Sequence, residues 1–366
     1  MLVEGKYVMT TRQAPAPDDF RASVDRLLGL MVGAYVSIMI LVGLRLGLYR
    51  ALKDTGPASS GELANHTGLH ERWLREWLHG QAAAGVINYR GDGRFELSLG
   101  AAFLLADEDH LLFQGGSFDS LPLSIDVAQR LPEAFRTGLG LTWDDSGPEG
   151  ANACEQTLRN WYRQQLVSTA LPMLEGVVDR LTAGGRVADV GCGTGVALIE
   201  MARAFPRAEF HGYDISEHAL RRAEAHRREA GLESVVFHNV ALEPLPADAS
   251  FDLVTTFDCL HDITQPAEVA AAIRAAVGPD GTWFIIDVNC APTFEENLRS
   301  GLAPMGYALS VLYCMSSGLS EPGGAGLGAL GLPEPAMREL VSAAGFTRFR
   351  RLDLRHPVNA FYEARP

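Results

Sequence analysis

The 366-residue sequence has little cysteine and no surplus of positive charge. Its five cysteines are scattered, their number is odd, and no two have the Cys-x-x-Cys spacing. That pattern argues against a disulfide framework and a Cys/His zinc site, so we predict a cytoplasmic protein without a bound metal. The net charge of −14 argues against nucleic-acid binding by the surface as a whole, because phosphate contacts need basic side chains.

Charge is also missing from one long stretch. Residues 27–44 contain no charged side chain, which meets the lower length limit for a membrane span. Three glycines and a serine interrupt this stretch, and its helical pattern continues into residues 45–54. We therefore predict a buried helix, at a contact between subunits, rather than a membrane helix. The polar, Pro-containing residues 1–18 before it predict a disordered tail.

Residues 45–98 follow the order of a winged helix. Three helical segments precede a hairpin signal, Arg-Gly-Asp-Gly at residues 90–93. This region carries only one more basic than acidic side chain, which is a poor footprint for DNA. Trp73 and Trp77 of the third helix are expected to be used in packing. We predict a winged-helix domain over residues 19–105 that does not bind nucleic acid, followed by a helical linker or lid over residues 106–172.

From residue 185 the pattern alternates between strands and helices. Apolar runs at residues 186–190, 208–214, 234–240, 251–260 and 281–288 are separated by helical segments, and residues 346–354 and 359–364 add two closing strands, which we expect to pair antiparallel. The alternation predicts an α/β, Rossmann-like, doubly wound sheet of seven strands over residues 173–366. Residues 290–332 interrupt it as an insertion that caps a substrate site.

A glycine-rich turn follows the first of these strands. Gly191, Gly193 and Gly195 lie between strand and helix, where glycine permits backbone angles and close approach that a Cβ would block. Asp214 ends the next strand, nineteen residues after Gly195. A carboxylate at that place can accept hydrogen bonds from both hydroxyls of a ribose. The loop, the acid and the strand–helix–strand context together predict a nucleoside-containing cofactor.

Residues 185–290 resemble the class I S-adenosylmethionine-dependent methyltransferases, whose first motif matches Asp189-Val-Gly-Cys-Gly-Thr-Gly195. Nearly the whole chain past residue 20 is similar in layout to bacterial small-molecule methyltransferases and plant O-methyltransferases with a winged-helix dimerisation domain. The resemblance implies a homodimer and S-adenosylmethionine as cofactor. It also implies that the glycine loop backs the methionine part, Asp189 holds its amino group and Asp214 holds the ribose. Ile215, Leu242 and Phe257 complete the expected cofactor contacts.

One position departs from that family pattern. Ala241 stands where many class I enzymes have an acid for the adenine amino group. Backbone groups near Ala241 and Leu242, or the side chain of Glu243, are the alternatives for this contact.

The segment Leu260-His261-Asp262 matches the Leu-His-Asp of plant-type O-methyltransferases, in which the histidine is the base. A hydroxyl or thiol acceptor must lose a proton, and a histidine with a near-neutral pKa suits that task. His261 follows the fourth strand, at the sheet edge where ligands bind in doubly wound folds. We therefore predict His261 as the general base. Asp262, Glu295 and Glu296 are candidates for the carboxylate that orients it, and the role of Asp258 stays open.

The expected substrate walls lie in the helical region before residue 185 and in the insertion. The aromatic or soft side chains available there are Trp143, Trp161, Tyr162, Tyr313 and Met315. They favour a small apolar acceptor. The function predicted is transfer of a methyl group to a hydroxyl, or alternatively to a thiol or amine. Two rival functions are a winged-helix regulator with a metabolite-sensing domain, and a methyltransferase fold that performs other chemistry.

Overall fold

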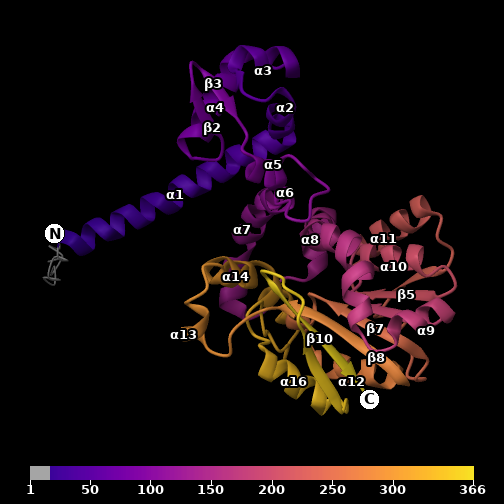
Figure 1. The fold of residues 1–366 in the computed structure, drawn as a ribbon. Coiled ribbons are helices and arrows are strands. Elements are labelled where there is room, and N and C mark those ends of the chain that lie inside the picture. The colour runs from indigo at the N-terminus through magenta and orange to yellow at the C-terminus, as the bar shows by residue number, and fades with distance from the viewer. Residues whose placement is uncertain (1–16) are drawn as a thin grey trace, which may run out of the picture. The chain divides into compact units, whose positions relative to one another are not determined.

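The computed structural model describes residues 17–366, so the predicted tail lies outside the described residues except for its last two positions. The chain divides into two compact units, Met1–Glu108 and Asp109–Pro366. Figure 1 shows the elements of both. Residues 17 and 18, predicted as tail, already belong to the first helix.

The first unit is a set of helices with a small antiparallel sheet. Its elements are α1 (Pro17–Arg45), α2 (Leu48–Thr55), β1 (Ala58–Ser59), α3 (Ser60–Thr67), α4 (Glu71–Ala83), β2 (Asn88–Gly91), β3 (Arg94–Glu96) and α5 (Leu99–Leu105). The strand order is β1-β3-β2. Asp92 and Gly93 in the hairpin turn both have positive φ, as a two-residue turn between twisted strands requires. The winged-helix prediction is confirmed.

Helix α1 is apolar but largely exposed within its own chain. Ile40 and Leu41 are buried, and the Trp77 indole N–H donates to the Met39 carbonyl at 3.0 Å. The earlier part of the helix extends beyond the other elements of its unit (Figure 1), and Leu27, Met31 and Tyr35 are more than half exposed. Residues 18–45 are long and apolar enough to cross a membrane, which for one helix near an N-terminus is weak evidence. Most of this helix is therefore not buried within the first unit, and the predicted contact between subunits stays a prediction.

The packing of helix α4 differs from the prediction that both of its tryptophans are buried. Its buried side chains are Leu74, Trp77, Leu78 and Gln81, at the i, i+3, i+4, i+7 spacing of one helical face. Trp73 falls outside that face and is 80% exposed. Only Trp77 is used in packing.

The second unit is built on a seven-stranded sheet with the order β6-β5-β4-β7-β8-β10-β9. The strands are β4 (Arg186–Val190), β5 (Glu209–Asp214), β6 (Val235–Asn239), β7 (Phe251–Phe257), β8 (Val277–Val288), β9 (Arg348–Leu352) and β10 (Asn359–Arg365). The first five are parallel, and β10 runs antiparallel to both β8 and β9. The predicted doubly wound sheet and its antiparallel closing pair are confirmed.

Helices cover both faces of this sheet. One face packs against α9 (Val177–Ala183), α10 (Val196–Ala204) and α11 (Glu217–Ala230), the other against α12 (Pro266–Ala276) and α16 (Glu334–Ala343). Before the sheet come α6 (Gly115–Asp119), α7 (Leu121–Thr137), η1 (Trp143–Ser146), α8 (Gly147–Trp161), η2 (Tyr162–Ala170) and η3 (Leu171–Met173). Around the carboxyl ends of β7 and β8 lie η4 (Leu260–Asp262), α13 (Phe294–Asn297), α14 (Ala303–Leu309), η5 (Ser310–Cys314) and α15 (Met315–Gly318).

Candidate active site

The glycine loop after β4 has the conformation that its sequence predicts. Gly191, Gly193 and Gly195 all have positive φ, between 53° and 75°. A Cβ on Gly191 would lie 2.7 Å from the Cys259 sulfur, whereas a Cβ on Gly193 would meet no atom within 4 Å. The loop is therefore closed against the protein at Gly191 and open at Gly193. A ligand has room to approach the backbone there.

Asp214 at the end of β5 lies against this loop. Its Oδ2 accepts the Gly193 N–H at 2.7 Å, and its Oδ1 accepts the Ser216 N–H at 2.8 Å. Burial raises the pKa of Asp214, and these backbone donors oppose the rise. A carboxylate oxygen has a second lone pair, so each oxygen can still accept a ligand hydroxyl. The structure thus brings together the loop and the acid that the sequence predicts as one site.

Asp189 lies deeper than Asp214. It is 2% exposed, and its Oδ1 accepts the Thr255 hydroxyl at 2.6 Å across from β7. Burial raises the pKa of Asp189 to about 7. A side chain with this environment can bind a cationic amino group, because a nearby positive charge would favour its ionised form.

The other predicted cofactor contacts differ in exposure. Ile215 and Leu242 are 58% and 80% exposed, whereas Phe257 is buried at the end of β7 and stacks on Tyr162 with ring centroids 5.6 Å apart. Glu243, the alternative partner for adenine, is hydrogen-bonded to His238 through Nδ1 at 2.6 Å. The Ala241 N–H is used by the Asn239 side chain at 3.0 Å.

A backbone turn at Asp258 directs the next residues back toward the sheet. Asp258 has φ 58°, a left-handed conformation that is uncommon for residues other than glycine and is often found at functional sites. Its N–H donates to the Ile286 carbonyl at 2.7 Å, and its Oδ1 accepts from the Asn359 amide at 2.9 Å. Burial raises the pKa of Asp258 to about 6. The turn leads into η4, which carries His261.

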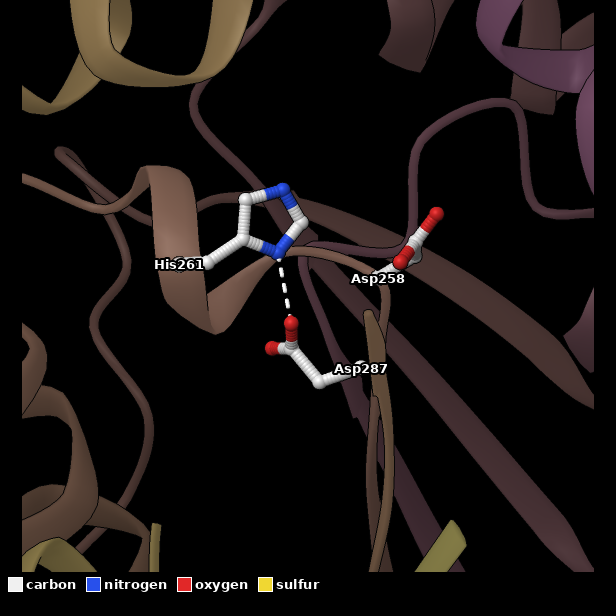
Figure 2. A group of neighbouring side chains, drawn as sticks. All are labelled: Asp258, His261 and Asp287. Carbon is white, nitrogen blue, oxygen red and sulfur yellow. Dashed lines mark hydrogen bonds and ion pairs between the residues drawn. The ribbon is translucent and has the colours of Figure 1, made fainter. Parts of the chain in front are cut away.

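His261 is paired with a carboxylate from the neighbouring strand. Its Nδ1 lies 2.7 Å from Oδ1 of Asp287, the last but one residue of β8, and the two side chains are 3% and 1% exposed. Figure 2 shows the second ring nitrogen pointing away from Asp287. Burial by itself lowers the pKa of His261, but the Asp287 carboxylate raises that pKa well above its ordinary value. The imidazole is thereby held in one orientation and its charged form is stabilised.

Sequence reasoning missed Asp287 as the orienting carboxylate. Asp262 accepts the Trp143 indole N–H at 3.0 Å instead, because adjacent side chains on a short turn point in different directions. Glu295 and Glu296 lie on the exposed helix α13, and Glu296 bonds to Thr293. The sequence feature that could have identified Asp287 is that it is the single acidic residue near the end of the apolar run at residues 283–288. Phe257 pairs with Ile286, so Asp287 lies beside the end of β7.

Asp258, His261 and Asp287 also form a possible metal-ligand group. One ligand atom from each lies within 4.8 Å of the others. Nδ1 of His261 is already taken up by Asp287. Our prediction that no metal binds stays a prediction, and its test is given below.

The predicted substrate residues divide into two groups. Trp143 and Tyr313 stack on each other at 6.1 Å with nearly parallel rings, and the Tyr313 hydroxyl lies 2.9 Å from the Ser124 hydroxyl. Both are partly exposed, as is Met315. Trp161 is buried in the core against Phe361, so its packing is structural. The neighbouring Cys314 side chain, which no sequence argument selected, adds to the rise in the pKa of His261.

Two protein families match the chain. A methyltransferase domain family matches residues 181–310, and an Rv2258c-like winged helix-turn-helix domain family matches residues 34–106. The chain carries a methyltransferase domain that follows a winged-helix domain. Each match lies within one of the two compact units.

Individual proteins resemble the chain in part or in fold. A ubiquinone biosynthesis O-methyltransferase from Ralstonia nicotianae is 41% identical over 109 residues, 29% of this chain and 44% of that protein. The chain spans about half the length of the curated relatives it matches. Human N-acetylserotonin methyltransferase, solved with SAM, has a TM-score of 0.67 at 17% identity, over 96% of this chain and 99% of that one. An O-methyltransferase family protein from Burkholderia thailandensis has a TM-score of 0.66 at 18% identity, over 93% and 97%.

Proposed function

We propose that this protein is an S-adenosylmethionine-dependent methyltransferase that transfers a methyl group to a hydroxyl of a small molecule. The observation that carries the proposal is the buried His261–Asp287 pair, 2.7 Å apart, beside the glycine loop that Asp214 holds. A nucleoside site and a proton acceptor at one edge of a parallel sheet are the two parts that such a transfer needs.

The residues present fit this cofactor. The open side of Gly193 leaves room for a ligand against the backbone, and the free lone pairs of Asp214 suit the two ribose hydroxyls. The buried Asp189 suits the cationic amino group. When bound, the cofactor supplies an activated sulfonium methyl group, so the protein's own task is alignment and removal of a proton.

His261 would take that proton on the ring nitrogen that points away from Asp287. The acceptor hydroxyl would give its proton to His261, and its oxygen would take the methyl group that the bound cofactor would supply, with S-adenosylhomocysteine as the other product. Asp287 fixes Nδ1 as the protonated nitrogen and stabilises the imidazolium that results. Because Asp287 raises the pKa of His261 well above the ordinary value, we expect the base form, and turnover, to increase on the alkaline side of neutrality.

The acceptor is proposed by class only. The relatives named as O-methyltransferases favour oxygen over sulfur or nitrogen. The partly exposed Trp143 and Tyr313 rings would suit a small apolar or aromatic molecule. Oxygen also agrees with the base, because a neutral hydroxyl is the acceptor that gains most from deprotonation.

The decisive test replaces His261 by Ala and measures two quantities. Transfer of labelled methyl groups from S-adenosylmethionine to a panel of small phenols should fall by about 10²–10⁴-fold. Affinity for S-adenosylhomocysteine, measured by calorimetry, should stay unchanged. Wild-type turnover in the variant would rule out His261 as the base and favour an acceptor that is already nucleophilic. Failure of the wild-type protein to bind S-adenosylhomocysteine would rule out the proposed function.

We also propose that the protein is a cytoplasmic homodimer that associates through the first unit, and the apolar surface of α1 supports the dimer. A helix that is apolar around its circumference needs cover from another chain or from lipid. The regulator alternative has little support, since Trp73 and a near-neutral charge balance are a poor basis for phosphate contacts. Absence of a specific complex with genomic DNA fragments at low salt is the expected outcome. If the protein binds S-adenosylhomocysteine but never produces it from S-adenosylmethionine, the hypothesis of a methyltransferase fold with another chemistry is favoured.

A further inference from the structure

The short turn η1 contacts both halves of the proposed site. Trp143 and Asp144 are adjacent, yet their side chains reach different elements of the second unit. Trp143 donates to Asp262 Oδ2 at 3.0 Å, directly after His261 in the sequence. Asp144 accepts from the Ser216 hydroxyl at 2.5 Å and from the Glu217 N–H at 3.3 Å, directly after the ribose-binding strand end.

Asp144 acts on the beginning of helix α11. Ser216 is the N-cap of that helix and accepts the Ala219 N–H at 3.2 Å, while its own N–H holds Asp214. The first N–H groups of a helix lack partners within the helix, and a negative charge is favourable beside them. Asp144 therefore provides an acceptor and a charge where α11 starts, two residues beyond the carboxylate that would bind the ribose.

Trp143 acts on the other half of the site. Its indole N–H donates to Oδ2 of Asp262, which is 6% exposed and follows His261 directly in the short turn η4. The backbone of this turn is held as well, because the Asp262 N–H donates to the Cys259 carbonyl at 3.1 Å and the His261 carbonyl accepts the Gly328 N–H at 3.0 Å. Trp143 therefore adds a side-chain contact that fixes the turn that carries the proposed base.

The turn is fixed in place from three sides. Thr142 and Asp145 form a capping box around it, and Arg130 of α7 donates to the Asp145 carbonyl and carboxylate at 2.7 and 3.0 Å. On the insertion side, the Leu141 N–H donates to the Ser316 hydroxyl at 2.8 Å. A Cβ on Gly140 would overlap the Ser316 backbone. Because η1 is fixed by these contacts, its side chains can hold Ser216 and Asp262 at a fixed separation.

We propose that Asp144 and Trp143 are positioning residues, the first for the cofactor through Ser216 and the second for the base through Asp262. This inference rests on the proposed function, because it assumes that Asp214 holds the ribose and that His261 takes the proton. Neither side chain needs to touch the reacting atoms for this role. Trp143, expected from the sequence to be a wall of the substrate site, has its polar edge committed to Asp262.

The test for Asp144 measures S-adenosylhomocysteine affinity by calorimetry in the full-length protein. Asp144→Ala should weaken binding about 10-fold, because a charge-assisted pair of hydrogen bonds is lost. Asp144→Asn, which keeps one acceptor, should weaken binding by roughly 3-fold. Glu149→Gln removes an exposed charge nearby in the first turn of α8 and should leave affinity unchanged. Wild-type affinity in both Asp144 variants would overturn this half of the inference.

The test for Trp143 compares kcat with cofactor affinity. Trp143→Phe keeps a ring against Tyr313 but removes the N–H that holds Asp262, so the turn that carries His261 loses one support. We expect kcat to fall by about 5-fold, with S-adenosylhomocysteine affinity unchanged. Glu149→Gln is again the control and should leave kcat unchanged. A wild-type kcat in Trp143→Phe would overturn this half. If the wild-type protein fails to bind S-adenosylhomocysteine, the proposed function fails first, which separates the two failures.

Discussion

Helix α1 and the site around His261 depart from the usual distribution of side chains in opposite directions. Residues 27–39 of α1 are apolar and mostly exposed. His261, Asp262 and Asp287 are polar and at most 6% exposed. Exposed apolar area and buried charged groups each lower the stability of a folded chain in water, so neither is expected without a further role. Both regions indicate something that the isolated chain does not contain.

The two regions differ in how far the chain itself compensates that cost. Most polar groups of the site have partners, since Asp287 Oδ1 pairs with His261, Asp262 with Trp143 and Asp258 with Asn359, whereas Asp287 Oδ2 is buried without a hydrogen bond. In α1, only the C-terminal part is packed: Ile40 and Leu41 are buried, and Trp77 of α4 contacts this part of the helix. The polar groups of the site are therefore satisfied mainly within the chain, whereas most of the apolar surface of α1 is not covered within the first unit. The predictions below separate these two kinds of dependence.

The largest expected effect comes from removing the charge of Asp287. Asp287→Asn keeps an acceptor for Nδ1 of His261 but no longer stabilises the imidazolium, so turnover should fall by roughly 10²-fold or more. The pKa of His261 should fall with it, and the acid limb of kcat/KM should move to lower pH. Glu296→Gln on the exposed helix α13 is the matched control. An unaltered rate would mean that the pair is structural.

The same pair predicts a pH dependence of stability. The pKa of His261 is higher in the folded state than in the unfolded chain, so the pair stabilises the fold fully below the unfolded pKa of about 6.5. That contribution is lost as pH rises through the folded pKa. Asp287→Asn should remove this loss, so the difference in free energy of unfolding between the two proteins should shrink as pH rises. Chemical denaturation at several pH values measures it, and a difference that grows with pH would contradict the assignment.

The second effect concerns α1. Replacing Met31 and Tyr35, which are 55% and 68% exposed, by Glu should convert a dimer to monomers, because two charges would have to be buried at the contact. Analytical ultracentrifugation gives the mass of each species. Ser23→Glu with Arg26→Glu adds charge to the polar beginning of the same helix and should leave the dimer intact. A wild-type protein that is monomeric and binds membranes would instead indicate that lipid covers the apolar surface of α1.

The third effect tests the cost of burying an acid. Asp189 has a pKa raised to about 7 by burial, so its ionised form destabilises the fold increasingly as pH rises from about 4 to 7 and fully above that range. Asp189→Asn keeps an acceptor for Thr255 and should raise the melting temperature at pH 8 by roughly 2–4 °C. The gain should vanish near pH 4, and S-adenosylhomocysteine should bind more weakly. A lower melting temperature at pH 8 would show that the amide is the worse buried group.

The sequence was sufficient for the sheet because hydrophobic periodicity and the glycine turn are local signals. Asp214 and His261 could be placed for the same reason, as polar residues directly after apolar strands. Asp287 has the same local signal at the end of β8, but its role depends on β7 and β8 being neighbours, with Phe257 beside Ile286. The contact of Trp143 with Asp262 spans 119 residues, and no local pattern encodes it. The exposure of α1 could not be predicted, because an apolar run has the same sequence signal whatever covers it.

The smallest expected effect is that of metal removal on the buried group of Asp258, His261 and Asp287. Asp258, His261 and Asp287 have the composition of a metal site, and a metal bound to His261 would need a deprotonated ring nitrogen and would therefore compete with its role as base. If the base assignment is right, dialysis against EDTA should leave turnover unchanged, and added Zn²⁺ should inhibit by occupying His261. Loss of activity on chelation, restored by a divalent cation, would instead mean that the two carboxylates serve a metal. In that case the contrast with α1 would change, since both regions would lack a partner.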